Sequence, residues 1–464
     1  MVTETRAALT EQQVTWSTLE TDFRYRRIDQ IYQRVVRETK SEELTFSERL
    51  DKILTHRIAG PLIFIFIFAL IFQTIFTWAE VPMNAIEQFV GWVGTQIALV
   101  MPPGVLQDLI VNGAIAGVGA VLVFLPQILF LFFFLSLLED SGYMARIAFI
   151  MDRFMRGVGL SGRSVIPLLS SFACAVPGIM ATRTIQNTRD RLITIMIAPF
   201  MSCSARLPVY VLMIGAFIPA SRVLGIFTLP GLTLLSMYLL GIVAAIVAAL
   251  VMKRLAGKGQ KPSTFVMELP PYRRPSLRWT SLQMVERAKI FVRDAGRVIL
   301  AISIVLWFLA SYPRPKQDMN PSTAIRHSYA GQIGHVMEPV IKPLGFDWKI
   351  GIGLITAFAA REVFVSTMAT IYNVEEQDEH SVTLRQALRA DRDPETGRHI
   401  YTPLTAISLM VFFVLACQCM STVAIVKRET NSWRWPLTMV VYMTTLAYLA
   451  SLVVFQGGKL LGLG

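Results

Sequence analysis

The sequence has 464 residues, of which 53% are hydrophobic and 16% charged, and a mean hydropathy of +0.51. These values exclude a soluble globular protein and indicate a polytopic membrane protein. The formal net charge of +12 does not indicate a nucleic-acid partner, because the basic residues cluster between apolar segments, as topology signals do. All four cysteines lie in apolar segments, so reduced thiols are expected rather than a disulfide framework.

The chain begins with a polar segment, residues 1–56, in which apolar residues recur at three- and four-residue steps between Phe23 and Val36. This pattern predicts a cytosolic amphipathic segment without a cleavable signal peptide. The first membrane span is expected at 60–79, running outward because basic residues precede it. An external interfacial segment is expected at 80–108, which contains no Lys or Arg, and a return span at about 112–138.

The stretch from Ser164 to Arg183 is apolar but interrupted by Pro167 and Pro177, with Cys174 between them. Basic residues flank it on both sides, which favours a re-entrant hairpin over a full crossing. A broken helix inside a bilayer must turn its freed backbone groups toward protein or a water-filled cavity, and ionisable residues there are functional candidates.

The remaining segments complete an all-α polytopic fold with about seven transmembrane helices and two re-entrant or broken gate helices. Spans are expected at 192–217 and 225–252, then a basic cytosolic linker, an outward span at 298–312, a second broken stretch at 351–372, and spans at 404–426 and 436–454. The predicted organisation is an N-terminal segment 1–56, a transmembrane region 57–252 with the first gate, a linker 253–297, and a transmembrane region 298–464 with the second gate.

The two halves of the sequence echo each other. The segment Phe172–Thr182 is similar to Phe358–Thr370, and Ser202–Ala205 is weakly similar to Gln418–Ser421. Because the first broken stretch opens from the cytosol and the second from outside, the pattern indicates an inverted repeat with a substrate site near the bilayer midplane.

Three cysteines in the interrupted stretches, Cys174, Cys203 and Cys419, are candidate ligands for a soft or borderline divalent metal. The alternative for each is a small buried hydrophobic residue, which cysteine often is. The coincidence of all three with broken or polar-interrupted segments favours the ligand interpretation.

Glu139 and Asp140 end the span at 112–138, at a helix C-terminus where negative charge is disfavoured. They call for a cation, either Arg146 or a passing metal ion, and the alternative is an interfacial pair solvated by water and headgroups. No phosphate-binding loop and no H-E-x-x-H motif occurs, and the five histidines lie outside the apolar stretches. The sequence therefore predicts a protein that is not an enzyme.

Two arginines lie inside apolar stretches. Arg361 is adjacent to Glu362, which predicts either a self-neutralised structural pair or a role for Glu362 as a gate or as a metal-relaying ligand. Arg206 precedes Pro208, and we expect it to bond carbonyl groups freed at a helix break.

Several motifs in order together resemble the membrane domain of the bacterial ferrous-iron transport protein B family: Leu137–Arg153, Val176–Arg183, Met201–Tyr210, Ala360–Val365 and Arg428–Trp435. The resemblance implies uptake of Fe2+ across the bacterial cytoplasmic (inner) membrane by a multi-pass, Feo-type permease. Fe2+ would be the transported substrate, with no permanently bound cofactor. By motif, Cys174 and Cys203 fall in the first gate region, and Glu362 and Cys419 in the second.

The chain departs from the family pattern in two respects. Family members usually begin with a GTP-binding domain, whereas here only Asp22–Ile28 resembles the join before the membrane domain, so nucleotide control is expected from a separate GTP-binding protein, is lost, or lies outside this chain. The first gate reads A-C-A-V-P in place of G-C-N-V-P, and Gln418 replaces a frequent proline.

The expected partners are the lipid bilayer, Fe2+, a separate GTP-binding protein and a small Feo accessory protein, with a homo-oligomer left open. Two other functions stay open: a carrier of nucleosides or other small solutes, and a non-conducting membrane subunit that scaffolds a G protein.

Overall fold

The computed structural model describes residues 19–35, 46–123, 125–219, 221–223, 227–255, 271–313, 327–359, 361, 363–372, 381–392 and 399–462. It is almost entirely helical in these residues, and the only sheet among them is a two-stranded hairpin of β1 (Arg222–Val223) and β2 (Phe227–Thr228). The predicted all-α polytopic fold is confirmed. The chain forms two compact units, Met1–Ile53 and Leu54–Gly464.

The first unit holds α2 (Leu19–Val35) and most of α3 (Phe46–Leu54). The first half of the second unit contains α4 (Ala59–Val100), α5 (Val105–Asp108), η1 (Leu109–Ile115), α6 (Ala116–Val123), α7 (Leu125–Asp140), α8 (Tyr143–Val158), η2 (Gly162–Ser164), α9 (Val165–Ala173), α10 (Ala175–Ala181), η3 (Thr182–Thr184), α11 (Thr188–Ile197), η4 (Ala198–Phe200), η5 (Ser204–Arg206), α12 (Leu207–Phe217) and α13 (Leu229–Leu255).

The second half of that unit contains α14 (Leu277–Ser311), α16 (Tyr329–Ile341), η6 (Lys342–Leu344), α17 (Trp348–Ala359), α18 (Val363–Ile371), α19 (Val382–Ala390), α20 (Pro403–Leu415), α21 (Met420–Thr430) and α22 (Arg434–Leu460).

Four continuous or nearly continuous helical segments of the described chain are long and apolar enough to cross a membrane: Thr188–Phe217, Leu229–Leu255, Pro403–Thr430 and Arg434–Leu460. The number becomes six if each of two sharply bent helix pairs is one span. About seven crossings were expected. The difference arises where an expected span is divided, as at 112–138, which the structure builds from η1, α6 and α7.

Two boundaries differ from the sequence-based expectation. Helix α4 continues through the segment expected to lie at the interface and runs for 42 residues, with Pro82 inside it. At 1.5 Å per residue it is about 63 Å long, roughly twice the thickness of a hydrocarbon core. Helix α14 begins at Leu277, inside the stretch 253–297 expected to be a linker.

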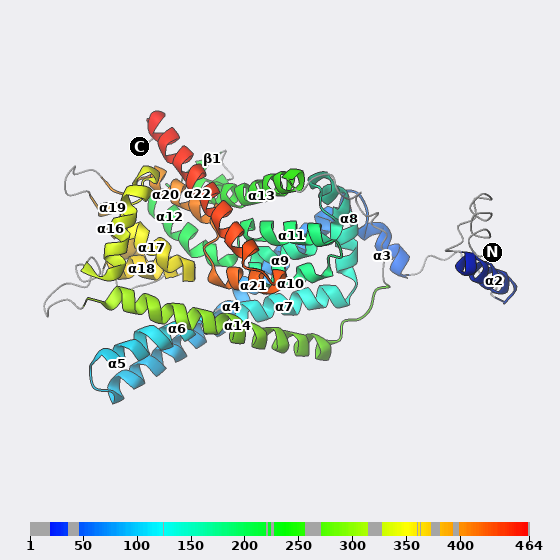
Figure 1. Cartoon of the computed structure of the whole chain (residues 1–464), viewed down its shortest axis with the longest axis horizontal. Helices are drawn as coiled ribbons and strands as arrows, with labels where there is room; N and C mark the ends of the chain where they lie inside the picture. Colours follow the sequence, from blue (N-terminus) through cyan, green and yellow to red (C-terminus); the bar gives the residue numbers. More distant parts are fainter. Residues whose placement is uncertain are drawn as a thin grey trace, which may run out of the picture. The chain divides into compact units, whose positions relative to one another are not determined.

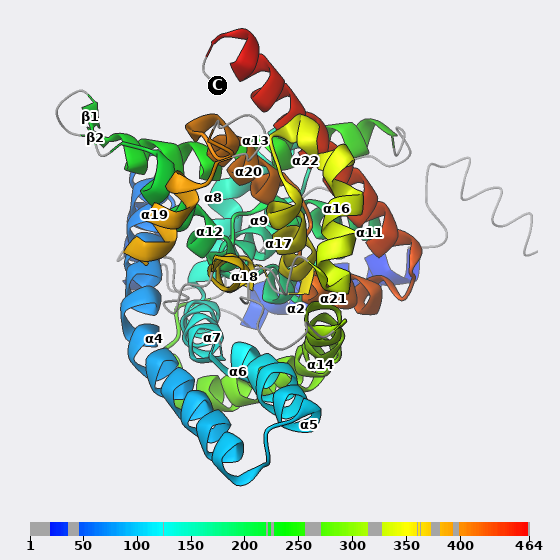
Figure 2. The ribbon, with the colours of Figure 1, turned by 90° about the vertical axis from the view of Figure 1, so that its left-hand side faces the viewer.

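The order of elements repeats in the two halves of the second unit. A short helix leads into a helical hairpin, then a helix interrupted near its middle, then a long straight helix: α8, α9–α10, α11–α12 and α13 in the first half, and α16, α17–α18, α20–α21 and α22 in the second. Figure 1 places α8 and α16 toward opposite ends of the helical body, and Figure 2 looks onto the end formed by α16, α17 and α19. This arrangement is that of an inverted repeat.

Burial separates the interrupted helices from the straight ones. The apolar windows of Thr188–Phe217 and Pro403–Thr430 are 67% and 83% buried inside the protein, whereas those of α13 and α22 are both 22% buried. Interrupted helices need protein around their breaks, because hydrocarbon offers no partner for freed backbone groups. The straight helices α13 and α22 therefore pack on the outside of the two interrupted ones.

Candidate functional site

Three helix breaks carry a cysteine immediately before the next helical segment. Cys174 separates α9 from α10, Cys203 precedes η5 and α12, and Cys419 precedes α21. Their backbones are extended, with φ and ψ of −156° and 133°, −81° and 165°, and −158° and 108°. All three side chains are partly exposed, whereas Cys417 is 1% exposed.

The prolines predicted to matter lie just after breaks. Pro167 and Pro177 occupy the first turns of α9 and α10, and Pro208 is the second residue of α12. A proline in the first turn is tolerated because its missing N–H would have no intrahelical acceptor there, while it prevents the preceding helix from continuing. Proline therefore follows the extended cysteine at two of the three breaks, three residues after Cys174 and five after Cys203, whereas no proline follows Cys419 within α21.

The first hairpin, α9–α10, is closed by a very close approach at Gly178. A Cβ atom at this position would lie 1.9 Å from Ser171 Oγ and 2.6 Å from the Pro167 carbonyl oxygen. The Ser171 hydroxyl donates to that same carbonyl at 2.8 Å. Only glycine fits here, so the hairpin arms pack in direct contact.

Arg206 is fully buried and serves the break in which it lies. Its guanidinium donates to the carbonyl oxygens of Pro199 at 2.7 Å, Phe200 at 3.2 Å and Met201 at 3.1 Å, and to Ser202 Oγ at 3.4 Å. These carbonyl groups belong to η4 and the turn after it, which the helix ladder leaves without donors.

Arg361 performs the same task for the other interrupted helix, across the fold. It is 4% exposed and donates to the carbonyl oxygens of Phe413 at 3.3 Å, Ala416 at 3.1 Å and Gln418 at 3.1 Å. The second hairpin is thus attached directly to the break between α20 and α21. Arg361 lies between α17 and α18, and Glu362 lies outside the described residues.

The breaks of the two halves lie near one another. Arg206 is close enough to Arg361, Cys203 and Cys417 for direct electrostatic interaction, and Cys417 interacts in the same way with Cys419. Helix α10 packs against η4 and along α21. The structure therefore gathers the two arginines and the cysteine-bearing breaks in the middle of the helical body.

Two of the three carboxylates predicted as ligands, Glu139 and Asp140, lie at the end of α7. Glu139 is exposed and Asp140 half-buried at the end of α7, where Thr280 Oγ1 on α14 donates to Asp140 Oδ2 at 3.4 Å. The described residues contain no group of three or more His, Cys, Asp or Glu side chains arranged to hold a metal ion.

A buried acidic residue that the sequence did not single out joins the halves at one end. Glu429 on α21 is 2% exposed in its side chain and accepts from Arg183 Nε at 2.9 Å, Arg183 Nη2 at 2.6 Å and Arg191 Nη2 at 2.9 Å. The feature of the sequence that could have revealed this site is a single acidic residue directly after Lys427 and Arg428, whose charge complements the basic tract Arg183–Arg191.

A second polar cluster lies at the start of α17. Asp391 accepts from Lys349 Nζ and from the Tyr372 hydroxyl, and the Tyr401 hydroxyl donates to Asp347 Oδ1 at 3.0 Å. Burial raises the pKa of the Asp347 carboxyl, against the opposing hydrogen bond from the Ile350 N–H and the charge of Lys349.

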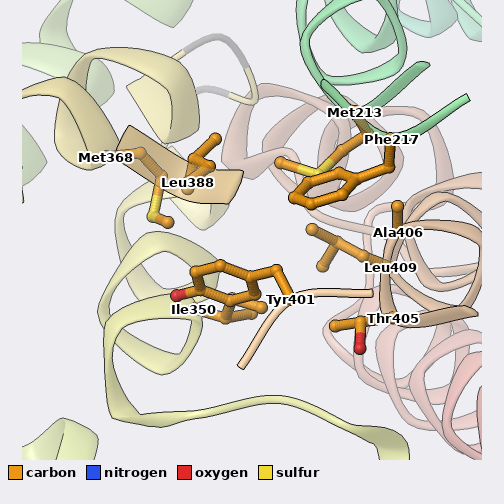
Figure 3. A pocket seen from close by; sticks show the side chains of 9 residues that line it. All are labelled: Met213, Phe217, Ile350, Met368, Leu388, Tyr401, Thr405, Ala406 and Leu409. Atoms are coloured by element: carbon orange, nitrogen blue, oxygen red, sulfur yellow. The ribbon is translucent and has the colours of Figure 1, made fainter. Parts of the chain in front are cut away.

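Tyr401 also lines an apolar pocket between elements of both halves. Figure 3 shows its lining side chains, which come from α12, α17, α18, α19 and α20 and the segment before α20: Met213, Phe217, Ile350, Met368, Leu388, Tyr401, Thr405, Ala406 and Leu409. The surface facing this pocket is apolar, because the Tyr401 hydroxyl donates to Asp347 instead. This pocket offers no charged group to a polar solute.

Comparison with known proteins assigns the chain to a family. A family model described as "Gate: Nucleoside recognition" matches residues 121–217 and 292–433, and one described as "Ferrous iron transport protein B C terminus" matches 234–287. No solved structure matches.

Curated relatives match most of this chain. A protein of Leptospira interrogans serovar copenhageni named "Fe(2+) transporter FeoB" is 52% identical over 88% of this chain and 59% of its own length. A protein of the same name from Staphylococcus aureus strain MSSA476 is 43% identical over 93% of this chain and 62% of its own length. A "Fe(2+) transport protein A/Fe(2+) transporter FeoB fusion protein" of Porphyromonas gingivalis is 41% identical over 95% and 55%.

The chain thus spans about three fifths of the length of the curated relatives it matches. Both family models fall on its second compact unit, and the Gate model covers the three cysteine-bearing breaks and the two buried arginines. The chain therefore belongs to the Gate family and to the ferrous-iron transport protein B family.

Proposed function

We propose that this chain moves ferrous iron across a bacterial cytoplasmic membrane along a path through the helix breaks, with Cys174, Cys203 and Cys419 as transient ligands. The observation that carries the proposal is the placement of these three thiols on extended backbone at three breaks in the middle of a multi-pass helical body. The names of the relatives support ferrous iron as the cargo.

The hydrogen bonds of the two arginines explain why we propose thiols, rather than backbone carbonyl oxygens, as the ligands of the metal ion. Six carbonyl oxygens at two of the breaks accept from Arg206 or Arg361. A guanidinium group that already occupies a carbonyl makes it a poor ligand for a cation, since the positive charge lies on the same side. The partly exposed thiols offer the soft contact that suits Fe2+ better than Mg2+ or Ca2+.

The same arginines couple iron binding to protons. A divalent cation is repelled by two buried positive charges unless the nearby thiols are ionised, and thiols bind metals as thiolates. Binding should therefore release protons, and release of the ion should follow reprotonation. Weak, stepwise binding of this kind suits permeation, because an ion must leave the site as readily as it enters.

The test is ferrous-iron uptake by the full chain in proteoliposomes without oxygen. Cys419→Ser keeps the size of the side chain and removes the soft donor, and Cys417→Ser is its matched control, two residues away in the same break but 1% exposed. We expect Cys419→Ser to lose most uptake per folded molecule and Cys417→Ser to keep it. Equal uptake by the two variants would contradict the proposal.

The metal and solute range separates the alternatives. We expect Mn2+ and Zn2+ to compete with Fe2+, and Mg2+ and Ca2+ to have no effect. Nucleoside uptake without iron uptake would instead identify a small-solute carrier, and absence of any flux from a folded chain would support a scaffolding role.

The finer assignments are part of the same proposal. The fusion of "Fe(2+) transport protein A" to the Porphyromonas gingivalis relative supports a small accessory protein as partner. A separate GTP-binding protein and a role without enzymatic activity for this chain stay predictions, and a pull-down with nucleotide-loaded candidate proteins checks the first.

A further inference from the structure

Glu429 forms ion pairs with Arg183 and Arg191 near the C-terminal ends of α10 and α21. The N-terminal ends of the same two helices each follow a candidate ligand, Cys174 and Cys419. Helices α10 and α21 come from different halves of the repeat and pack along each other. Arg183 lies in η3, the turn that follows α10, and Glu429 lies in the last turn of α21, so their ion pair joins the C-terminal ends of the two helices.

The spacing from this ion pair back to the cysteines is almost the same on both helices. Arg183 lies nine positions after Cys174, and Glu429 lies ten positions after Cys419. At the helical rise these distances are about 14 Å and about 15 Å. Two packed helices that run in the same direction from a shared fixed point therefore bring their cysteines to the same depth.

The ion pairs of Glu429 with Arg183 and Arg191, called the clamp below, have a geometry that resists sliding of α21 along α10. Arg183 approaches Glu429 with a bidentate fork, Nε to Oε2 at 2.9 Å and Nη2 to Oε1 at 2.6 Å. Arg191 on α11 donates to Glu429 Oε2 at 2.9 Å and to its backbone carbonyl at 3.3 Å. A sliding movement of α21 by one helical turn would break all of these bonds at once and leave a charge that is 2% exposed without partners.

We propose that Glu429, held by Arg183 and Arg191, is a positioning residue that fixes α21 against α10 and thereby holds the Cys419 thiol level with the Cys174 thiol. The inference rests on the proposed function for its consequence in transport, because it specifies how two of the three ligands are brought together. Loss of the clamp lets α21 slide or tilt, which separates the thiols without altering either of them.

The test measures thiol geometry directly. In the full chain carrying Cys203→Ser and Cys417→Ser, only Cys174 and Cys419 remain as thiols. Cd2+ is titrated into the detergent-solubilised protein, and the cadmium–thiolate absorption per bound ion reports whether one or two thiols coordinate it. We expect one Cd2+ per chain with the intensity of two thiolates.

Arg183→Gln weakens this two-thiolate binding at least tenfold, and Arg156→Gln leaves it unchanged. The control is closely matched, because both arginine side chains are 54% exposed and both form ion pairs, Arg156 with Asp152 within α8. Glu429→Asp shortens the side chain but keeps the charge, and recovers part of the binding that Glu429→Gln loses. If Glu429→Gln fails to fold, two other variants still test the proposal: Arg183→Gln, which changes an exposed side chain, and Glu429→Asp.

Non-additivity distinguishes a clamp from separate effects. The Arg183→Gln, Glu429→Gln double variant is expected to bind Cd2+ no more weakly than Glu429→Gln alone. Two-thiolate binding of parental strength in folded Arg183→Gln and Glu429→Asp overturns the positioning role. Clamp-dependent Cd2+ binding without thiol-dependent iron uptake supports the positioning role and removes the proposed function, so the two failures are distinct.

Discussion

Replacing Arg361 with methionine should open the break between α20 and α21. Methionine fills a similar volume but removes the hydrogen bonds to the carbonyl oxygens of Phe413, Ala416 and Gln418, which are 3.1–3.3 Å long. These groups lie inside the protein and inside a membrane, where no lipid atom can replace the donor.

The magnitude follows from the number of carbonyls left without donors. A buried polar group that loses its partner costs about 1–3 kcal/mol, so three carbonyls set a gross cost of about 3–9 kcal/mol. Removing the guanidinium also removes the desolvation penalty of a buried charge, and water that enters the break can hydrate the carbonyl groups. Both effects offset part of this cost. We take about 3 kcal/mol as the net change in the free energy of local opening, which corresponds to a ratio on the order of 100-fold.

Thiol labelling measures this opening. Cys417 is 1% exposed, so a maleimide reaches it only when the break opens. In a variant whose other cysteines are serine, Arg361→Met should raise the labelling rate of Cys417 on the order of 100-fold, whereas Arg156→Gln should not. A folded Arg361→Met variant with the parental labelling rate would refute the assignment of Arg361 to this break.

Three further changes test other parts of the account. Gly178→Ala forces the hairpin arms apart and should destabilise the chain by about 1–3 kcal/mol, while Gly157→Ala, whose Cβ meets nothing within 4 Å, should not; thermal unfolding in detergent compares them, and equal midpoints would argue against the tight hairpin. Lys349→Met leaves Asp391 without its ammonium partner and should lower the unfolding midpoint; an unchanged midpoint would show that the pair is dispensable. Because burial raises the pKa of Asp347, the folded chain keeps a proton that the unfolded chain releases, so stability should fall as the pH rises from about 4. Asp347→Asn should flatten that slope, and the same slope in both proteins would assign it to another group.

The breaks themselves could be predicted from local sequence. Proline at positions 167, 177 and 208 and cysteine among small residues mark the ends of short helices, since proline acts on its own helical turn. The repeat was visible for the same reason, because Phe172–Thr182 and Phe358–Thr370 encode the same local interruption. The expected seven crossings differ from the structure where an apolar segment is divided without a strong local signal.

The partners of the buried charges could not be predicted. Arg361 donates to residues 52–57 positions away, and Arg183 reaches Glu429 across 246 positions. Nothing in local periodicity specifies which distant helix will lie alongside. The extent of α4 was missed for a different reason: the absence of basic residues after Ala79 indicates a side of the membrane, but it does not end a helix, and neither did Pro82.

The central claim is that thiols at the helix breaks bind the ion during transport, and Cys174→Ser tests it most directly. Serine keeps the size of the side chain and removes the soft donor from the first hairpin. The measurement is ferrous-iron uptake into proteoliposomes, normalised to the amount of folded protein that they contain. The account predicts that Cys174→Ser inserts and folds as the parent does but loses most of its uptake. Parental uptake per folded molecule would contradict it.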